Sequence, residues 1–248
     1  MNMPLFYSKV VPVDSTAHRN LCVQSAPTRF GFARSANLIP AVIDEFGAAM
    51  QHLPIAFLPG SKNPAAVFVV GLQPGTNLFL NQENRWEGGY LPAYLRRYPF
   101  IVGNVPEGEP LLCVDEQYEG LSTSGERLFS DDGEPQAPLI QARDLAAEYK
   151  RSADRTDEFG ETLQRLGLLT GVSLNVATEN GGTSAVHGLL VVDEAAFDRL
   201  GADDVRQLHE KRFLKPIIQH LVSLAAVSKL GDRHARNASG AGQSAAVN

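Results

Sequence analysis

Two pairs of short apolar segments, each joined by a turn-forming sequence, constrain the fold of this chain more than any other feature. Residues 55–58 and 67–72 flank Pro-Gly-Ser-Lys-Asn-Pro, and residues 174–177 and 187–192 flank Glu-Asn-Gly-Gly-Thr. Apolar runs of this length around Gly, Pro and Asn residues are typical of β-hairpins, whose strands pair antiparallel. The sequence therefore predicts a mixed or antiparallel sheet, with further short strands at residues 10–13, 21–23 and 111–114.

A long helical pattern follows in the second half of the chain. Between residues 138 and 166 the apolar side chains recur at spacings of three, four and their multiples, which indicates helix. The middle of this segment, residues 151–158, is almost wholly polar. The pattern therefore predicts either one helix with an exposed centre or two helices.

Other helices are expected on either side of this segment. Residues 37–50 carry apolar side chains at every fourth position, and Asn37 suits the N-cap. Amphipathic helices are expected after Asp203 and over residues 214–230, the second ending at Gly231 as its C-cap. The sequence thus predicts an α+β fold in which one domain, residues 1–231, packs helices on its sheet and residues 232–248 form a flexible C-terminal tail.

The composition is that of a folded, acidic protein. Of the 248 residues, 44% are hydrophobic and 20% are charged, which excludes disorder of the whole chain. The net charge of −6 argues against nucleic acid as a partner, because binding a polyanion needs a basic surface. We expect no signal peptide and no membrane span, and the lone Cys22 and Cys113 are expected to be buried thiols. These features predict a cytoplasmic protein.

The densest group of aromatic and basic residues lies between residues 85 and 100. Its members are Arg85, Trp86, Tyr90, Tyr94, Arg96, Arg97, Tyr98 and Phe100. Pro92 and Pro99 are expected to bracket a short helix, on which neighbouring residues project about 100° apart. One of Arg96 and Arg97 should therefore point inward and the other outward. Arginines beside aromatic rings can hold a carboxylate or phosphate bidentately, so the segment is a candidate site for an anionic ligand.

Asp115, Glu116 and His18 complete the candidate set. The two acids follow a predicted strand, and one interpretation is that they pair with Arg96 and Arg97 while Trp86, Tyr90 and Phe100 fill the core. The other is that Asp115, Glu116 or His18 serves as an acid–base group in an enzyme. No two of the six histidines have the i, i+4 spacing of a helical zinc site, so neither a metal nor a cofactor is expected.

Many of these segments together resemble the SapC family, over residues 6 to 230. The matching pieces are residues 18–21, 32–33, 37–40, 45–46, 54–57, 71–72, 77–79, 114–116, 128–129, 132–135, 188–194 and 221–224, and the specific stretch from Arg85-Trp86 through Gly89-Tyr90 to Arg96-Arg97-Tyr98-Pro99-Phe100. The family is bacterial and takes its name from a surface-layer gene cluster. The resemblance supplies no catalytic residues.

The resemblance implies an accessory role. The genes of family members often lie near genes for TonB-dependent receptors and for flavin-dependent, tryptophan-halogenase-like proteins. These proteins are the partners that the resemblance implies. Three hypotheses result. The first is a cytoplasmic binding or accessory protein that holds a small anionic molecule, a peptide or a protein partner at the arginine segment. The second is an enzyme of unrecognised type that uses the same pocket, and the third is a structural protein associated with the surface layer. Cell fractionation would separate the third hypothesis from the others.

Overall fold

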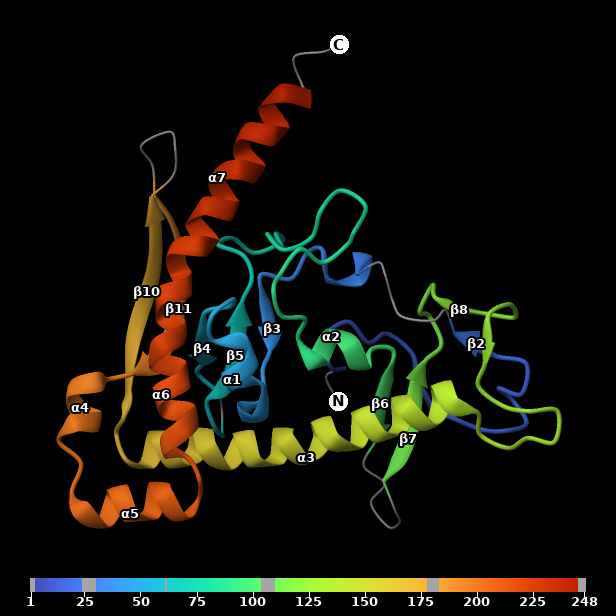
Figure 1. Ribbon diagram of the computed structural model, residues 1–248, viewed down its shortest axis with the longest axis horizontal. Helices are drawn as coiled ribbons and strands as arrows, with labels where there is room; N and C mark the ends of the chain where they lie inside the picture. Colours follow the sequence, from blue (N-terminus) through green and yellow to red (C-terminus); the bar gives the residue numbers. More distant parts are fainter. Residues whose placement is uncertain (1–2, 24–29, 61, 104–109, 178–182, 245–248) are drawn as a thin grey trace. The chain divides into compact units, whose positions relative to one another are not determined.

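The structure is a computed structural model that describes residues 3–23, 30–60, 62–103, 110–177 and 183–244 (Figure 1). The chain divides into two compact units, which are described separately. Unit 1 comprises Met1–Phe32 and Ala93–Arg151, and unit 2 comprises Ala33–Pro92 and Ser152–Asn248. Both units combine helices with strands, and the pairings between the described strands are antiparallel, so the predicted α+β class is confirmed.

Unit 1 contains two small sheets, each of three strands. One has the strand order β1-β7-β6 and the other the order β8-β2-β9. The bounds are β1 Val10–Pro12, β2 Cys22–Val23, β6 Phe100–Gly103, β7 Leu111–Asp115, β8 Leu121–Ser122 and β9 Glu126–Arg127. The short helix α2, Ala93–Arg97, lies between the two prolines expected to bracket it, and a 3-10 turn, η1 Gly31–Ala33, crosses the division between the units.

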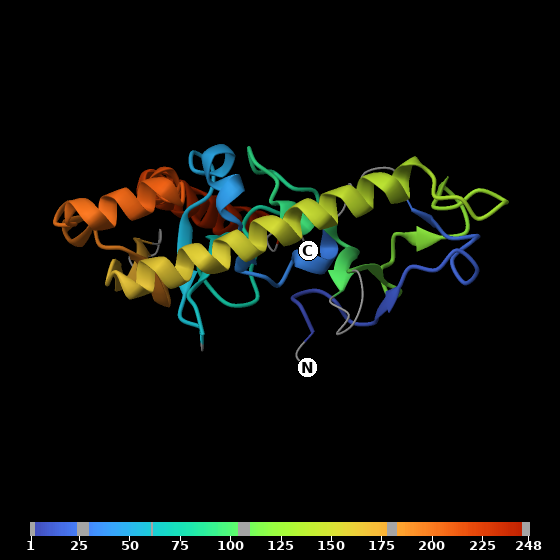
Figure 2. The same cartoon turned by 90° about the horizontal axis from the view of Figure 1, so that it is seen from below.

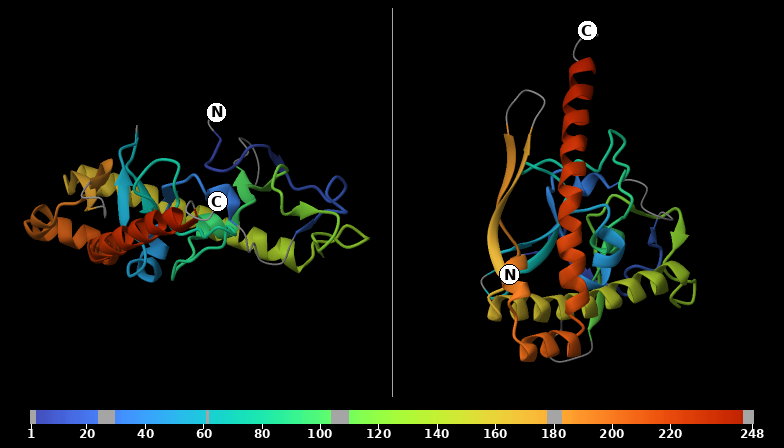
Figure 3. Two further views of the ribbon diagram at one scale, coloured as in Figure 1. Left: turned by 90° about the horizontal axis from the view of Figure 1, so that it is seen from above. Right: turned by 60° about the vertical axis from the view of Figure 1, so that its left-hand side comes forward.

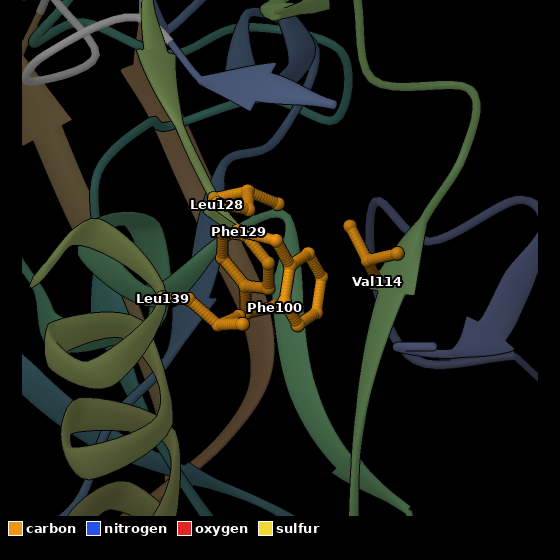
Figure 4. Packing of buried hydrophobic residues seen from close by; sticks show 5 residues of the cluster. All are labelled: Phe100, Val114, Leu128, Phe129 and Leu139. Carbon is orange, nitrogen blue, oxygen red and sulfur yellow. The ribbon is translucent and has the colours of Figure 1, made fainter. Parts of the chain in front are cut away.

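The apolar core of unit 1 forms where β6 and β7 meet the start of the helix α3, Ala137–Arg165. Phe100 of β6 and Val114 of β7 face Leu139 of the helix, and Leu128 and Phe129 reach them from the segment after β9 (Figure 4). All five side chains are buried. Burial of this much apolar surface is what holds such short strands together, because two- or three-residue pairings contribute few hydrogen bonds.

Unit 2 is built on one five-stranded sheet with the order β10-β11-β4-β5-β3. Its bounds are β3 Leu38–Pro40, β4 Ile55–Leu58, β5 Ala65–Val69, β10 Leu169–Ala177 and β11 Thr183–Val192. Both predicted hairpins are confirmed as antiparallel pairs, β4 with β5 and β10 with β11. The turn predicted for the second hairpin is residues 179–183, of which residues 179–182 lie outside the described residues.

The helices of unit 2 follow the sheet in the sequence. They are η2 Ile43–Glu45, α1 Phe46–Ala49, α4 Glu194–Asp198, α5 Ala202–Glu210, α6 Leu214–Ser223, η3 Leu224–Ala226 and α7 Val227–Ser244. The last three run on from one another as a rod (Figure 3), and α6 contacts β4 and β11 while α7 contacts β10. Because α7 continues through Gly231, the expected C-cap there is wrong. The predicted domain boundary at residue 231 stays a prediction.

Residues 37–50 do not form the expected single helix. Residues Leu38–Pro40 are β3, an edge strand paired with β5, and the carbonyl of Asn37 accepts hydrogen bonds from the amides of Val70 and Gly71. Pro40 fits here because an edge strand can spare one backbone donor. Helix begins only at Ile43. The residues with apolar side chains at every fourth position form a strand followed by a helical turn. The strand is favoured because the neighbouring strand offers backbone hydrogen-bond partners that an N-cap does not.

The pattern at residues 138–166 forms one helix, α3 Ala137–Arg165 (Figure 2), which settles the alternative of one helix or two. Its polar middle is not simply exposed. In unit 2, Ser152 donates a hydrogen bond to Asp44, and the Thr156 hydroxyl donates to the Ser152 carbonyl and accepts from the Ile43 amide. Buried hydroxyl groups with partners on both sides cost little, so polar residues serve as packing residues on this face.

Candidate anion-binding site

Helix α2 places its two adjacent arginines on opposite sides, as expected. Arg96 is exposed, whereas the Arg97 side chain is 93% buried in unit 1, with 7% exposure. The Arg97 guanidinium carbon lies 4.2 Å from the centroid of the Tyr149 ring, 4.5 Å from that of Tyr94 and 5.7 Å from that of Tyr7. The inward arginine is thus surrounded by the faces of three tyrosines, whereas one interpretation of the sequence paired it with Asp115 or Glu116.

This ring cage accounts for a buried charge. The negative face of each aromatic ring attracts the guanidinium, and the attraction strengthens once water is excluded. Burial raises the pKa of Tyr7 and Tyr94, which keeps both hydroxyl groups protonated, while the positive charge of Arg97 acts in the opposite direction. Among the described residues, the Nε of Arg97 has no hydrogen-bond partner. The cage is enclosed, so it anchors α2 and offers a ligand no entry.

Asp115, at the end of β7, holds the N-terminal segment to the sheet. Its carboxylate accepts hydrogen bonds from the amides of Ser8 at 2.8 Å, Lys9 at 2.9 Å and Gln117 at 3.1 Å, and from the hydroxyl of Tyr98 at 3.3 Å. Burial alone would raise the pKa of Asp115, but these donors outweigh it and hold the pKa below its usual value. A carboxylate that is occupied by four donors has a structural role.

Glu116 and His18 do meet, at the surface of unit 1. The Oε2 of Glu116 forms an ion pair with the Nζ of Lys9 at 2.6 Å, and its Oε1 lies 3.6 Å from the Nε2 of His18. The Nδ1 of His18 accepts a hydrogen bond from the Asp14 amide. In the neutral ring the proton is therefore on Nε2, which faces Glu116. The hydrogen bond and ion pair with Lys9 lower the pKa of Glu116. An ionised glutamate beside a lysine at the surface is poorly suited to acid–base catalysis.

Arg85, Trp86 and Tyr90 belong to unit 2 and so form a separate group. Trp86 stacks on Phe79 with 5.2 Å between ring centroids and 16° between ring planes, and its Nε1 donates to the Tyr90 carbonyl. Tyr90 donates from its hydroxyl to Glu45, and Arg85 is exposed near Glu83. Of the three rings expected in the core, Phe100 is buried, whereas Trp86 and Tyr90 are half-buried.

A hollow with a basic lining lies beside this stack, at residues that the sequence did not point to. It has a volume of about 530 Å³ and lies in unit 2, between the segment 78–87 and helix α7. Its charged lining residues are Arg34, Glu87, Arg233 and Arg236; its apolar ones are Leu78 and Leu80, and the rest carry amide side chains. We call this hollow the guanidinium pocket.

Two of its arginines are held in place. The Arg233 guanidinium covers the Phe79 ring, 4.3 Å from the ring centroid, and its Nη2 donates to the Glu87 carbonyl at 2.6 Å. On the other wall, Arg34 donates from Nε to the side-chain oxygen of Asn84 and from Nη2 to the Asn81 carbonyl, both at 2.6 Å. These contacts fix both guanidinium groups before any ligand arrives.

The electrostatics of the pocket are unbalanced. Burial lowers the pKa of Arg233, and the positive charge of Arg236, one helical turn away, lowers it further, while Glu87 acts in the opposite direction. The only carboxylate of the lining, that of Glu87, already accepts a hydrogen bond from the Asn81 side chain at 3.1 Å. Partly desolvated cations of like charge form a site that attracts anions.

Sequence reasoning missed this pocket because it assigned residues 232–248 to a flexible tail. The signal was nevertheless present: Arg233 and Arg236 have the i, i+3 spacing that puts two residues on one helix face. The missing step was that the helix continues through Gly231, which brings this face to Phe79 and Trp86.

Other kinds of site find little support in the part of the chain that the structure describes. There, no three His, Cys, Asp or Glu side chains come close enough together to hold a metal ion. Within the described ranges, no helix has the length and apolar character needed to cross a membrane. Cys22 and Cys113 are free and buried, as expected, and burial raises the pKa of Cys113, which makes its thiol a poor nucleophile.

Comparison with known proteins gives one match. The model of the SapC family matches residues 13–230 of the chain. No curated protein and no solved structure matches it. The matched range covers both described units and ends three residues before Arg233, so the family match includes Arg34, Glu87 and the Phe79–Trp86 stack but not the two arginines of α7.

Proposed function

We propose that this chain, which belongs to the SapC family, is a cytoplasmic binding or accessory protein that holds an anionic ligand in the guanidinium pocket. The two free, buried cysteines support a reducing compartment. The arginines of the lining can donate hydrogen bonds and compensate charge. Its one carboxylate is already hydrogen-bonded to Asn81, so the chemistry favours binding over catalysis.

The observation that carries this proposal is the surplus of positive charge in a preformed hollow. Three guanidinium groups face one carboxylate, and two of the three are fixed by hydrogen bonds to the segment 81–87. Preorganised donors bind more tightly than mobile ones because less side-chain entropy is lost on binding. An anion would relieve the repulsion between Arg233 and Arg236.

Arg96 remains a second candidate contact for an anionic partner, on unit 1. It is exposed, whereas Arg97 is enclosed by rings, so Arg96 is the outward arginine expected to contact a ligand and Arg97 is the inward one. Because the guanidinium pocket has a volume and several converging donors, we place the ligand there.

The chain offers its own probe for the test. Trp86 is the only tryptophan, and it stacks on the ring that Arg233 covers, so its fluorescence should respond when an anion binds Arg233. Titration with small organic anions, followed by this fluorescence and by calorimetry, should show saturable binding. The Arg236→Gln variant should bind at least tenfold more weakly, the amount expected for losing one charge-assisted contact of about 1.5 kcal/mol.

Arg206→Gln is the matched control, because Arg206 is an exposed helical arginine of the same unit that pairs only with its neighbour Asp203 in the described structure. It should bind anions like the wild type. If the wild type binds no anion, or if Arg236→Gln binds as tightly as Arg206→Gln, the proposed function is wrong.

A further inference from the structure

We infer that the ligand of the guanidinium pocket is a phosphate monoester, with its dianionic phosphate among Arg34, Arg233 and Arg236 and its organic group against the leucines of the wall. This inference rests on the proposed function and specifies its ligand class. Charge, donor geometry and volume support it, each from a separate observation.

The charge of the pocket matches a dianion. Three guanidinium groups and the Glu87 carboxylate leave two positive charges without a partner in the lining. A single carboxylate or a sulfate monoester carries one negative charge and would neutralise only one of them. A phosphate monoester carries a charge of about −1.5 to −2 at pH 7, so it compensates the surplus with a single group.

The donors that remain available point to a group with several oxygens. A guanidinium has five N–H donors, and the described contacts use the Nε and Nη2 of Arg34 but only the Nη2 of Arg233. Arg34 therefore keeps Nη1, and Arg233 keeps Nε and Nη1, with Arg236 exposed beside them. Three terminal phosphate oxygens can accept from three guanidinium groups on two walls, whereas a planar carboxylate has two oxygens.

The volume indicates an ester rather than free phosphate. About 530 Å³ is within the range of sites for small organic ligands and leaves space beside a phosphate group. Leu78 and Leu80 line the same hollow and are already almost fully buried, with 4% and 6% exposure. An organic substituent on the fourth phosphate oxygen would fill the remaining space and pack against these side chains, with little apolar surface left to bury.

The test uses four probes at pH 7.5 on the full-length chain: phenyl phosphate, inorganic phosphate, phenyl sulfate and succinate. Phenyl sulfate has the tetrahedral shape with one charge, and succinate has two charges without the tetrahedral shape. We expect phenyl phosphate to bind at least tenfold more tightly than phenyl sulfate and succinate, and several-fold more tightly than inorganic phosphate. Arg34→Gln and Arg236→Gln should each weaken phenyl phosphate binding at least tenfold, and Arg206→Gln should not change it.

The outcomes separate the inference from the proposed function. Succinate or phenyl sulfate binding as tightly as phenyl phosphate, with loss in Arg236→Gln, would refute the phosphate assignment and leave anion binding standing. Inorganic phosphate binding as tightly as phenyl phosphate would refute the ester. Failure of all four probes to bind would refute both. Thermal melts of each variant identify any substitution that unfolds the chain. Arg34 and Arg236 are both exposed, so if one Gln variant unfolds, the other carries the same test.

Discussion

His220 makes the stability of unit 2 depend on pH. Its side chain is fully buried on α6, its Nε2 accepts a hydrogen bond from the Val192 amide at 3.0 Å, and its ring lies 5.1 Å from that of Phe57. Burial lowers the pKa of His220 from 6.5 to about 4, because a charged imidazole would lose its hydration there, and a protonated Nε2 could no longer accept from Val192.

The sign and size of the effect follow from proton linkage. Between pH 6.5 and about pH 4 the unfolded chain binds a proton at residue 220 that the folded chain excludes, so stability falls as the pH falls. At about 1.4 kcal/mol per pKa unit, the interval from 6.5 to about 4 corresponds to about 3 kcal/mol. Above pH 6.5 and below about pH 4 this residue adds no further slope.

The assay is urea unfolding at several pH values from 7.5 to 4, followed by the fluorescence of Trp86, which belongs to the same unit. Other groups also titrate over this range, so the informative quantity is the difference between variants. His220→Gln cannot be protonated and should lose about 3 kcal/mol less than the wild type over this interval. His209→Gln, at an exposed position on α5, is the control and should follow the wild type. Equal pH dependence in wild type and His220→Gln would refute the reasoning.

Two further predictions concern unit 1. Arg97→Met should lower the free energy of unfolding by no more than about 2 kcal/mol. The rings supply cation–π attraction, so the substitution leaves no partner charge buried without compensation. A loss of 4 kcal/mol or more in denaturant unfolding would indicate a carboxylate partner. Asp115→Asn should cost about 2–3 kcal/mol at pH 7, because an amide nitrogen would face backbone N–H donors. Since the folded pKa of Asp115 is lowered, this stabilisation is present above pH 3.8 and is lost as the pH falls further. An Asp115→Asn variant as stable as the wild type at pH 7 would contradict this prediction.

The hairpins and the long helix could be predicted from the sequence, because each has a local cause. The strands on either side of residues 59–64 are apolar enough to be buried, and the turn sequence between them fixes their direction. The strand at Leu38–Pro40 could not be predicted in the same way. Its three residues pair with a partner almost thirty residues away, and nothing local distinguishes such a strand from the first turn of a helix.

The sequence predicted arginine beside aromatic rings for the candidate site, and that site stays a prediction. The described residues form this combination twice, once at Arg97 and once at Arg233. Only the first lies in the segment where basic and aromatic residues adjoin in the sequence. The second joins Phe79 to a residue more than 150 positions later, a contact that depends on α7 passing through Gly231.

The two arginine–aromatic contacts differ in how far the fold compensates the positive charge of the arginine. Arg97 has ring faces of three tyrosines around it and 7% exposure, so the fold itself satisfies the charge and leaves no space for a ligand. Arg233 has one ring beneath it and a second arginine beside it, and its pKa is lowered first by burial and then by the charge of Arg236. Glu87 is the one acid among the described lining residues, and it faces three arginines. This surplus of positive charge supports the proposal that an anion binds in the hollow.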